Sequence, residues 1–261
     1  MKLVVKIGGA ALEDKRVLSQ CARAVVELAA SGHQVAVVHG GGSALTRTLK
    51  SLGKQSSFVN GLRITDAETR DVALMVLSGM VNKNLVAAIG SSGHPAVGLC
   101  GGDGLTFRAR KKETPGCDLG FVGEIISADP RWIEAIWAQS AIPVIASVAL
   151  GIDGEYYNVN ADQMASACAI ACSANALIFL TDVPGVKGAD GAVMQWLHLH
   201  QVSGLVKDAV ITGGMLPKLE ACEHALHHGV GRVRIVPAQE AHQLPQFGFM
   251  KLDCGTEVLF A

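Results

Sequence analysis

The sequence predicts an α/β protein with a largely parallel sheet and helices on both faces of that sheet. Short apolar segments alternate with segments whose apolar residues recur three and four positions apart, which is the pattern of strands joined by helices. Two of the apolar segments end in runs of glycine, at residues 8–9 and 40–42. Hydrophobic residues make up 49% of the 261 residues, so the chain can bury a substantial core.

Strands are expected where apolar runs are short and bounded by glycine or polar residues. Such runs occupy residues 3–9, 35–42, 96–100, 142–147, 176–180 and 232–236. The runs at 142–147 and 176–180 are almost wholly apolar and predict buried strands. Between residues 101 and 124 the chain is polar and glycine-rich, and its short alternating segments predict hairpins.

Helices are expected between these strands. The apolar face from Val17 to Leu28 predicts a helix that ends at residues 31–32, Ser-Gly. Residues 65–68, Thr-Asp-Ala-Glu, have the pattern of a capping box before a helix through about Leu77. Residues 129–130, Asp-Pro, predict another helix start, with proline at the first helical position. Further helices are expected at 43–53, 82–90 and 161–173, and another follows the glycines at 213–214 and runs through residue 228. No internal repeat or clean domain boundary is visible.

The two glycine runs predict an anion-binding site. Consecutive glycines at the end of a strand leave backbone N–H groups open to a ligand, and a helix that starts behind them adds its positive dipole end. Lys6 adds a point charge beside the first run. Parallel α/β sheets bind ligands beyond the carboxyl ends of their strands, where both runs fall. The sequence lacks GxxxxGK[ST], and it has no GxGxxG between a strand and a helix, so the common nucleotide motifs do not apply.

Three further segments carry candidate functional groups. Residues 158–162, Asn-Val-Asn-Ala-Asp, place two amides and a carboxylate at a helix start, although an N-cap cluster alone would look the same. Lys218 lies one turn into a helix that follows paired glycines, where the helix dipole disfavours a cation unless an anion compensates it. Arg63 precedes a capped helix, and its planar guanidinium matches a carboxylate with two parallel hydrogen bonds.

Composition argues against several functional classes. The formal net charge is −1 with no basic block, so nucleic acid is not expected as a partner. The N-terminus shows no secretory signal, and the uncharged stretch 163–181 is better explained by a buried helix and strand than by a membrane span. The seven cysteines form no CxxC pair, which favours a reduced cytoplasmic protein that uses cysteine in its core. No metal site is expected at the paired histidines.

Taken together, seven motifs resemble the amino-acid kinase superfamily and, within it, the acetylglutamate kinases. In chain order they are KIGGA, VVHGGG, NGLRITD, MVLSGMVNKNLV, NVNADQMA, LTDVPGV and ITGGMLPK. The resemblance implies an open three-layer αβα sandwich with a mainly parallel central sheet. It also implies an N-terminal lobe, about 1–174, for the acyl amino acid and a C-terminal lobe, about 175–261, for ATP. The expected reaction is phosphorylation of the γ-carboxylate of N-acetyl-L-glutamate by ATP, the second step of arginine biosynthesis.

The resemblance assigns roles where the motifs match. Lys6 and Lys218 would hold the phosphoryl group in flight, and Asp162 would orient both ammonium groups. The N–H groups of Gly8, Gly9, Gly41 and Gly42 would line the phosphate path, Arg63 would pair with the substrate α-carboxylate, and Asn158 would contact the acetylamino end. The nucleotide would be bordered by Thr181, Asp182, Val183, Pro184, Gly185, Val186, Ile211, Thr212 and Gly213.

The chemistry of the expected step needs no general base, because a carboxylate nucleophile is already ionised at neutral pH. Alignment and charge cancellation are what the protein must supply, with Mg²⁺ held mainly by ATP oxygens and water. Two alternatives stay open. A sibling kinase could act on a substrate one methylene longer, such as N-acetyl-aminoadipate, and a non-catalytic nucleotide-binding module could share the scaffold.

The start of the chain bears on assembly. Arginine-inhibited members of the family carry an extra N-terminal helix that links dimers into a ring of six, whereas here the first expected strand begins at Lys2. We therefore expect a homodimer with little arginine feedback.

Overall fold

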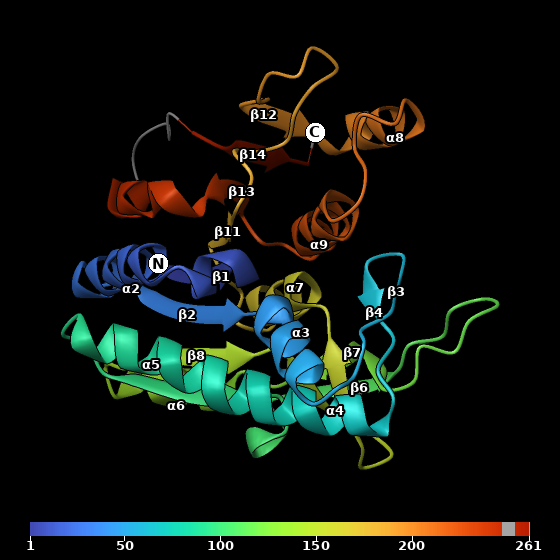
Figure 1. The fold of residues 1–261 in the computed structure, drawn as a ribbon. Helices are drawn as coiled ribbons and strands as arrows, with labels where there is room; N and C mark the ends of the chain where they lie inside the picture. The colour runs from blue at the N-terminus through green and yellow to red at the C-terminus, as the bar shows by residue number, and fades with distance from the viewer. Residues whose placement is uncertain (247–253, 261) are drawn as a thin grey trace.

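The centre of the computed structural model, which describes residues 1–246 and 254–260, is an eight-stranded sheet. All neighbouring strands are parallel except β13 and β14 (Figure 1). In spatial order the strands are β12 (Trp196–His198), β14 (Thr256–Leu259), β13 (Arg232–Pro237), β11 (Ala176–Thr181), β1 (Lys2–Ile7), β2 (Gln34–His39), β8 (Ile142–Ala146) and β5 (Ala96–Cys100). The mainly parallel sheet expected from the sequence is confirmed.

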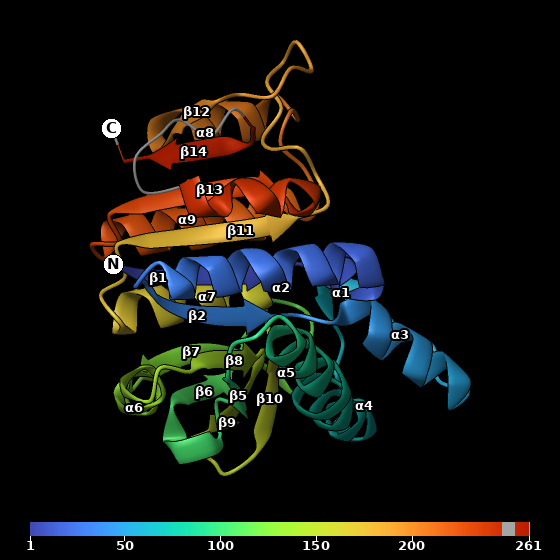
Figure 2. The same cartoon turned by 90° about the vertical axis from the view of Figure 1, so that its left-hand side faces the viewer.

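Helices cover both faces of this sheet, so the three-layer arrangement is also confirmed (Figures 1 and 2). The alternating side chains of β1 divide the core. Leu3, Val5 and Ile7 pack in one cluster with α2 (Lys15–Ala30), α5 (Asn82–Ser91) and η3 (Ala238–Gln246). Val4 packs in the opposite cluster with α6 (Arg131–Ala138), α7 (Ala161–Ala171) and α9 (Met215–His227). By the two-residue period of a strand, Lys6 lies on the same face as Val4.

A second, smaller sheet lies beside the carboxyl end of the main one. It is a closed set of four strands, β6 (Phe107–Lys111), β7 (Val122–Ala128), β9 (Val148–Gly151) and β10 (Tyr156–Val159). β6 and β7 are antiparallel and confirm the hairpin expected in the glycine-rich stretch. A separate two-stranded hairpin pairs β3 (Phe58–Val59) with β4 (Leu62–Arg63). The remaining short elements are α1 (Gly9–Glu13), α3 (Gly42–Ser51), η2 (Asp103–Leu105) and α8 (Leu199–Lys207).

The two helices expected at 65–77 and 82–90 are one continuous helix. It begins as α4 (Ala67–Ala73), passes through the π-helical stretch η1 (Leu74–Val81) and ends as α5. The expected capping box at its start is wrong. Asp66, not Thr65, caps the helix by accepting a hydrogen bond from the Thr69 N–H at 2.9 Å. The Glu68 carboxylate pairs with Lys54 instead of reaching back to the cap.

That continuous helix, Ala67–Ser91, is also long and apolar enough to cross a membrane by length and composition. Buried residues make up 44% of its most apolar window, and a core helix of a globular protein passes the same test. The stretch 163–181, in contrast, is the buried helix and strand that its sequence predicts, α7 followed by β11. Cys21, Cys168, Cys172 and Cys222 are buried and unpaired, as expected for small core residues.

The register of the central strands fixes where the loops meet. Ile7, the last residue of β1, pairs with His39 at the end of β2 and with Leu180 near the end of β11. Three parallel strands therefore finish at the same level, and the residues that follow them are neighbours at one edge of the sheet.

The Asp66 cap gives a testable prediction for stability. In the variant Asp66→Ala the Thr69 N–H loses its acceptor, and the expected loss is about 1 kcal/mol of unfolding free energy. For a chain of this size that loss corresponds to a fall in Tm of roughly 2–4 °C. Calorimetry measures the difference directly.

Glu68→Ala is the matched control for this experiment. Both Asp66 and Glu68 pair with the Lys54 ammonium, but only Asp66 caps the helix. Exposed ion pairs contribute little, so Glu68→Ala is expected to leave Tm nearly unchanged. Equal Tm values for the two variants would show that the cap does not stabilise the helix.

Candidate active site

Both predicted glycine turns lie at the common edge of β1, β2 and β11. The two glycines after β1 differ in their hydrogen bonding, because the N–H of Gly8 donates to the Leu180 carbonyl at 2.8 Å. Gly8 is therefore held in the sheet, and Gly9 is the residue of this pair that lines the cavity described below. The expectation that the Gly8 N–H lines a phosphate path is corrected by this hydrogen bond.

Lys6, Asp162 and Lys218 meet at the same edge although they are far apart in the sequence. The Lys6 Nζ lies 2.8 Å from Asp162 Oδ1, and the Lys218 Nζ lies 3.0 Å from Asp162 Oδ2. Each residue is at most 8% exposed. The three side chains come from β1, α7 and α9, which pack together on one face of the sheet. One carboxylate thus holds two ammonium groups, one at each oxygen.

Burial and charge act in opposite directions on these groups. Burial alone raises the pKa of Asp162, but attraction to Lys6 and Lys218 outweighs it and holds the pKa below its ordinary value. For Lys6 burial wins: it lowers the pKa, Asp162 opposes the shift, and the like charge of Lys218 adds to it. Asp162 is therefore ionised at neutral pH, and Lys6 is a more readily deprotonated amine than a surface lysine.

Local sequence explains how α7 and α9 present their charged residues. The Asn160 side chain caps α7 by accepting hydrogen bonds from the N–H groups of Asp162 and Gln163 at 2.8 and 3.2 Å. This cap places Asp162 in the first turn, beside the two lysines. Lys218 lies in the first turn of α9, where the dipole disfavours it, and Asp162 supplies the compensating anion that its position predicts. The Lys218 Nζ also lies 5.1 Å from the centre of the Phe179 ring.

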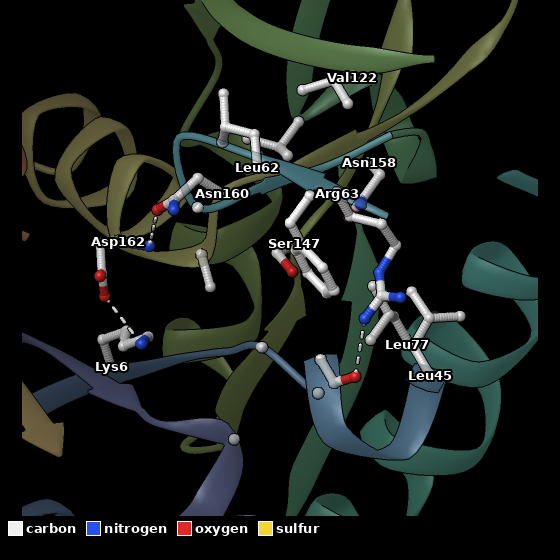
Figure 3. A pocket seen from close by; sticks show the side chains of 18 residues that line it. Lys6, Leu45, Leu62, Arg63, Leu77, Val122, Ser147, Asn158, Asn160 and Asp162 are labelled. Carbon is white, nitrogen blue, oxygen red and sulfur yellow. Dashed lines mark hydrogen bonds and ion pairs between the residues drawn. The ribbon is translucent and has the colours of Figure 1, made fainter. Parts of the chain in front are cut away.

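A cavity of about 230 Å³ extends from this charged group to Arg63 and Asn158 (Figure 3). Lys6 and Asp162 lie at one end of it, and Arg63 lies at the other. The wall between them is formed by backbone of the glycine turns and by apolar side chains. The lining residues include Gly9, Gly40, Gly41, Gly42, Leu45, Phe58, Leu62, Leu77, Val122 and Ser147.

Arg63 is held firmly although it lines a cavity. One terminal nitrogen donates to the Gly42 carbonyl at 3.0 Å and to Thr46 Oγ1 at 2.7 Å, and the other donates to the Ser56 hydroxyl. Its guanidinium lies 4.6 Å from the centre of the Phe58 ring. These contacts leave part of the guanidinium for a ligand, because an arginine has five N–H donors. Arg63 thus links the β3–β4 hairpin to the start of α3.

Two further polar residues line the cavity: Ser147 lies between Lys6 and Arg63, and Asn158 lies beside Arg63 (Figure 3). Asn158 was predicted, and its amide donates a long hydrogen bond of 3.4 Å to Thr65 Oγ1. Ser147 was missed by the sequence reading, although it follows the last residue of β8 and is 2% exposed. Its place at the carboxyl end of a buried strand is a signal that the sequence does carry.

The two glycine turns lie within van der Waals distance of each other. A Cβ atom added to Gly9 would lie 3.6 Å from the Gly42 nitrogen and 3.8 Å from the Gly41 nitrogen. In the described part of the chain neither of these N–H groups has an acceptor. The glycine at position 9 therefore leaves open the space in front of two N–H donors, at the start of a ten-residue helix.

The residues predicted to bind nucleotide lie outside this cavity. Thr181 ends β11, and its hydroxyl donates to the Asp182 carboxylate at 3.1 Å. The Val186 N–H donates to Thr256 Oγ1 at 2.9 Å. The preceding residue, Gly185, has a φ of +147°, a backbone conformation that disfavours a side chain. The Asp182 carboxylate is close enough to Lys6 to oppose the lowering of the Lys6 pKa. The first nucleotide segment, 181–186, is thus adjacent to the charged group.

The second predicted nucleotide segment, residues 211–213, precedes α9. Gly213 has a φ of +59° and borders a cavity of about 550 Å³ together with Gly214, Leu216 and Pro217. Residues 59–62 of the β3–β4 hairpin line the same cavity. The start of α9 and the hairpin therefore border one opening.

The donor set does not form a metal cage. No group of three or more histidine, cysteine, aspartate or glutamate side chains converges among the described residues. Asp162 is the one carboxylate among the residues that line the 230 Å³ cavity, and both of its oxygens contact lysines. A magnesium ion at this site would have to be held mainly by the ligand's own oxygens and by water.

The Asp162 contacts predict a large effect on stability. In Asp162→Asn two buried ammonium groups lose their counter-ion, and the expected cost is about 3–5 kcal/mol of unfolding free energy. Because the folded pKa of Asp162 lies below the ordinary 3.8, this contribution is complete above that pH and is lost as pH falls through the folded value. Urea unfolding at pH 7 measures it.

The control for Asp162→Asn is the double variant Lys6→Met/Asp162→Asn. It removes one of the two uncompensated cations, so it is expected to be more stable than Asp162→Asn alone. An Asp162→Asn protein that unfolds at the urea concentration of the unaltered chain would contradict a stabilising role of the carboxylate.

Comparisons with known proteins agree with this geometry. A family model described as the amino acid kinase family matches residues 1–237. Acetylglutamate kinase of Acidobacterium capsulatum is 66% identical to this chain over 259 residues, with 99% of each chain covered. Acetylglutamate kinase of Koribacter versatilis is 57% identical, also with 99% of each chain covered. A solved structure from Streptococcus mutans UA159 superposes with a TM-score of 0.84 at 30% identity and covers 100% of this chain and 99% of its own. The chain belongs to the amino acid kinase family, and within that family it groups with the acetylglutamate kinases.

Proposed function

We propose that the protein transfers the γ-phosphoryl group of ATP to the γ-carboxylate of N-acetyl-L-glutamate, the second step of arginine biosynthesis. The observation that carries this proposal is the pairing of Lys6 and Lys218 on one carboxylate at the edge where two glycine turns meet. Its support from relatives is the identity of 66% over nearly the whole chain with an acetylglutamate kinase. ATP use follows from membership of the kinase family.

The cavity suggests how the acyl substrate is oriented. N-acetyl-L-glutamate carries two carboxylates, and the cavity has cationic groups at both ends. Arg63, which is fixed by three hydrogen bonds, suits the α-carboxylate because its guanidinium binds carboxylates in a planar fork. Asn158 would contact the acetylamino group. The γ-carboxylate would then point toward Lys6 and the N–H groups of Gly41 and Gly42.

In the transfer step these residues align groups and cancel charge. The substrate carboxylate is the nucleophile and carries no proton at neutral pH, so none of the site residues has to remove one. Lys6 and Lys218 would lie beside the phosphoryl group as it moves, and Asp162 would keep both amines in place. The N–H groups of Gly9, Gly41 and Gly42 would donate to its oxygens. Donors that are fixed before reaction need no rearrangement when charge develops.

ATP would enter with Mg²⁺ bound to its phosphate oxygens, because the cavity has no free carboxylate for a metal. The segments 181–186 and 211–213 would border the nucleotide. We propose that the N-terminal lobe, about 1–174, binds the acyl amino acid and that the C-terminal lobe, about 175–261, binds ATP. The two parts share one sheet, since β1 pairs directly with β11.

Assembly and location complete the proposal. We propose that the enzyme works in the cytoplasm as a homodimer. The exposed side chains of Met75 and Met80 on η1 offer apolar area to a second copy, with exposed fractions of 62% and 47%. The homodimer stays a prediction, as does the low sensitivity to arginine.

The test is an assay of ADP release with N-acetyl-L-glutamate and, separately, with N-acetyl-L-aminoadipate. We expect activity with the first substrate, and turnover of the longer one alone would favour the sibling reaction. In Lys6→Ala and in Lys218→Ala we expect kcat to fall by roughly a hundred-fold, or about 3 kcal/mol, because each variant removes one fixed cation from the transition state. Circular dichroism confirms that each variant is folded.

The matched control for the lysine variants is Lys2→Ala. Lys2 begins β1, the strand that carries Lys6, and its ammonium pairs with the Glu134 carboxylate at 3.0 Å outside the cavity. Its loss is expected to leave kcat within about twofold, since surface substitutions are usually tolerated. Unchanged turnover in a folded Lys6→Ala/Lys218→Ala protein would exclude the proposed roles, and no ADP release with either substrate would favour a nucleotide-binding module.

The lowered pKa of Lys6 predicts the pH dependence of the reaction. Burial is the largest cause, so Lys6 loses its proton below the ordinary pKa of 10.5. Protonated Lys6 is the form that attracts the phosphoryl group. The value of kcat/KM, which reports the free enzyme, should therefore fall as pH rises, with a midpoint below 10.5.

Lys6→Arg tests whether this alkaline decline belongs to Lys6. Arginine keeps its charge throughout the accessible range, so the residual activity of this variant should no longer decline in the same interval. A decline at the same pH in both proteins would assign it to another group.

A further inference from the structure

A buried histidine lies directly behind the second glycine turn and has no role in the mechanism above. His39 ends β2 and is fully buried. Its Nδ1 lies 2.7 Å from the carbonyl oxygen of Gly40, and its Nε2 lies 3.0 Å from the amide nitrogen of Asn82. That amide also donates to the Val144 carbonyl at 2.9 Å. The ring therefore has a specific partner at each nitrogen.

These contacts fix the protonation state of the ring. A carbonyl oxygen only accepts, so Nδ1 carries the hydrogen that is donated to Gly40. Nε2 is then the acceptor, and it faces the NH₂ side of Asn82. The orientation of that amide is set on its other side, where Lys83 donates to Oδ1 at 3.1 Å. Burial supports the neutral form, because it lowers the pKa of His39 to about 4.

The hydrogen bond to Gly40 determines the direction of the next N–H group. The carbonyl of Gly40 and the N–H of Gly41 belong to one peptide unit, and the described chain contains no cis peptide bond. In a trans peptide these two groups point in opposite directions. With the carbonyl held against the buried ring, the Gly41 N–H is directed away from His39. Gly41 lines the cavity, and its nitrogen faces the space that Gly9 leaves open.

The long helix holds the same turn from a second side. A Cβ atom added to Gly41 would lie 2.7 Å from Leu77 Cδ2 and 3.2 Å from Val81 Cγ2. Both residues belong to η1, and Asn82 follows directly after it. The π-helical stretch therefore presents two apolar side chains to Gly41 and the amide of Asn82 to His39. Such stretches are uncommon and often occur at functional sites.

We propose that His39 and Asn82 are positioning residues for phosphoryl transfer. Through the Gly40 carbonyl they hold the Gly41 N–H in the direction where it donates to the transferring phosphoryl group. This inference rests on the proposed kinase function. Neither residue touches the substrate, and the Gly41 N–H that they direct donates to the phosphoryl group as it moves, so the main effect of losing them appears in kcat.

The test compares His39→Leu with His39→Asn. Leucine fills much of the space but removes the donor, and we expect kcat to fall about tenfold, less than the loss of a direct donor. The KM for N-acetyl-L-glutamate should stay within about twofold, because uniform binding is unaffected. Asparagine places an amide nitrogen near the position of Nδ1, so His39→Asn should recover most of kcat. Inhibition by ADP with aluminium fluoride should weaken in His39→Leu as kcat does.

Asn82→Ala and Leu85→Ala complete the experiment. Asn82→Ala removes the partner of Nε2 and should lower kcat severalfold even if His39→Leu does not fold. Leu85 is a fully buried residue on the same helix that packs in the core cluster of Leu3, Val5 and Ile7, so Leu85→Ala should lower Tm and leave kcat unchanged. An inactive unaltered chain would refute the proposed function. If the unaltered chain is active, an unchanged kcat in His39→Leu or Asn82→Ala would overturn the positioning role. So would a fall in kcat in Leu85→Ala as large as that in the other two variants.

Discussion

One carboxylate between two ammonium groups is the interaction on which the site depends. Lys6 and Lys218 approach Asp162 from a strand and a helix more than two hundred residues apart, and all three are buried. Without the carboxylate, two like charges would share a poorly solvated space. The same contacts connect β1, α7 and α9, so the charged group fixes the packing of one sheet face as well as the position of the amines. Its chemistry and its structural role cannot be separated.

The remaining groups are placed by the parallel sheet. Because β1, β2 and β11 end at one level, the loops that follow them are brought together by the strand register alone. Each loop then contributes its own groups to the site. The turns after β1 and β2 provide backbone N–H donors, and the segment after β11 lies next to Lys6 through Asp182. Arg63 is the exception, since it comes from a small hairpin and is fixed by contacts with α3.

Much of this arrangement could be predicted from the sequence, because periodicity and glycine position are local signals. All six expected strands are present. The contact of both lysines with Asp162, which the family resemblance implies, is present as well.

The prediction from sequence failed where tertiary packing decides the structure. Residues 78–81 show no helical spacing of apolar residues that would reveal a π-helical connection. Two helices were therefore expected where the structure has one. The Thr65 pattern matched a capping box, but the Asp66 carboxylate is one residue closer and accepts the Thr69 N–H instead. β9, β10 and β12 have at most four residues each, too few for alternation to be distinctive. Ser147 directly follows a buried strand, which is a signal that the sequence carries. The role of His39 could not be assigned, because it depends on a contact with Asn82, 43 residues away in the sequence.

The charge of the site explains why the histidine behind the glycine turn must be neutral. Lys6 and Lys218 contribute two positive charges, and Asp162 cancels one of them. The single positive charge left over is what an incoming carboxylate or phosphoryl group can neutralise. A protonated His39 would add a third cation close to Lys6, and the repulsion between them is one of the causes that lower the pKa of the ring. It would also turn Nε2 into a donor facing the donor side of Asn82. Burial avoids both conflicts, because it keeps the ring neutral and leaves Nδ1 to hold the Gly40 carbonyl. A neutral side chain thus directs the N–H groups of the anion site, and Lys6 and Lys218 supply the positive charge at this end of the cavity.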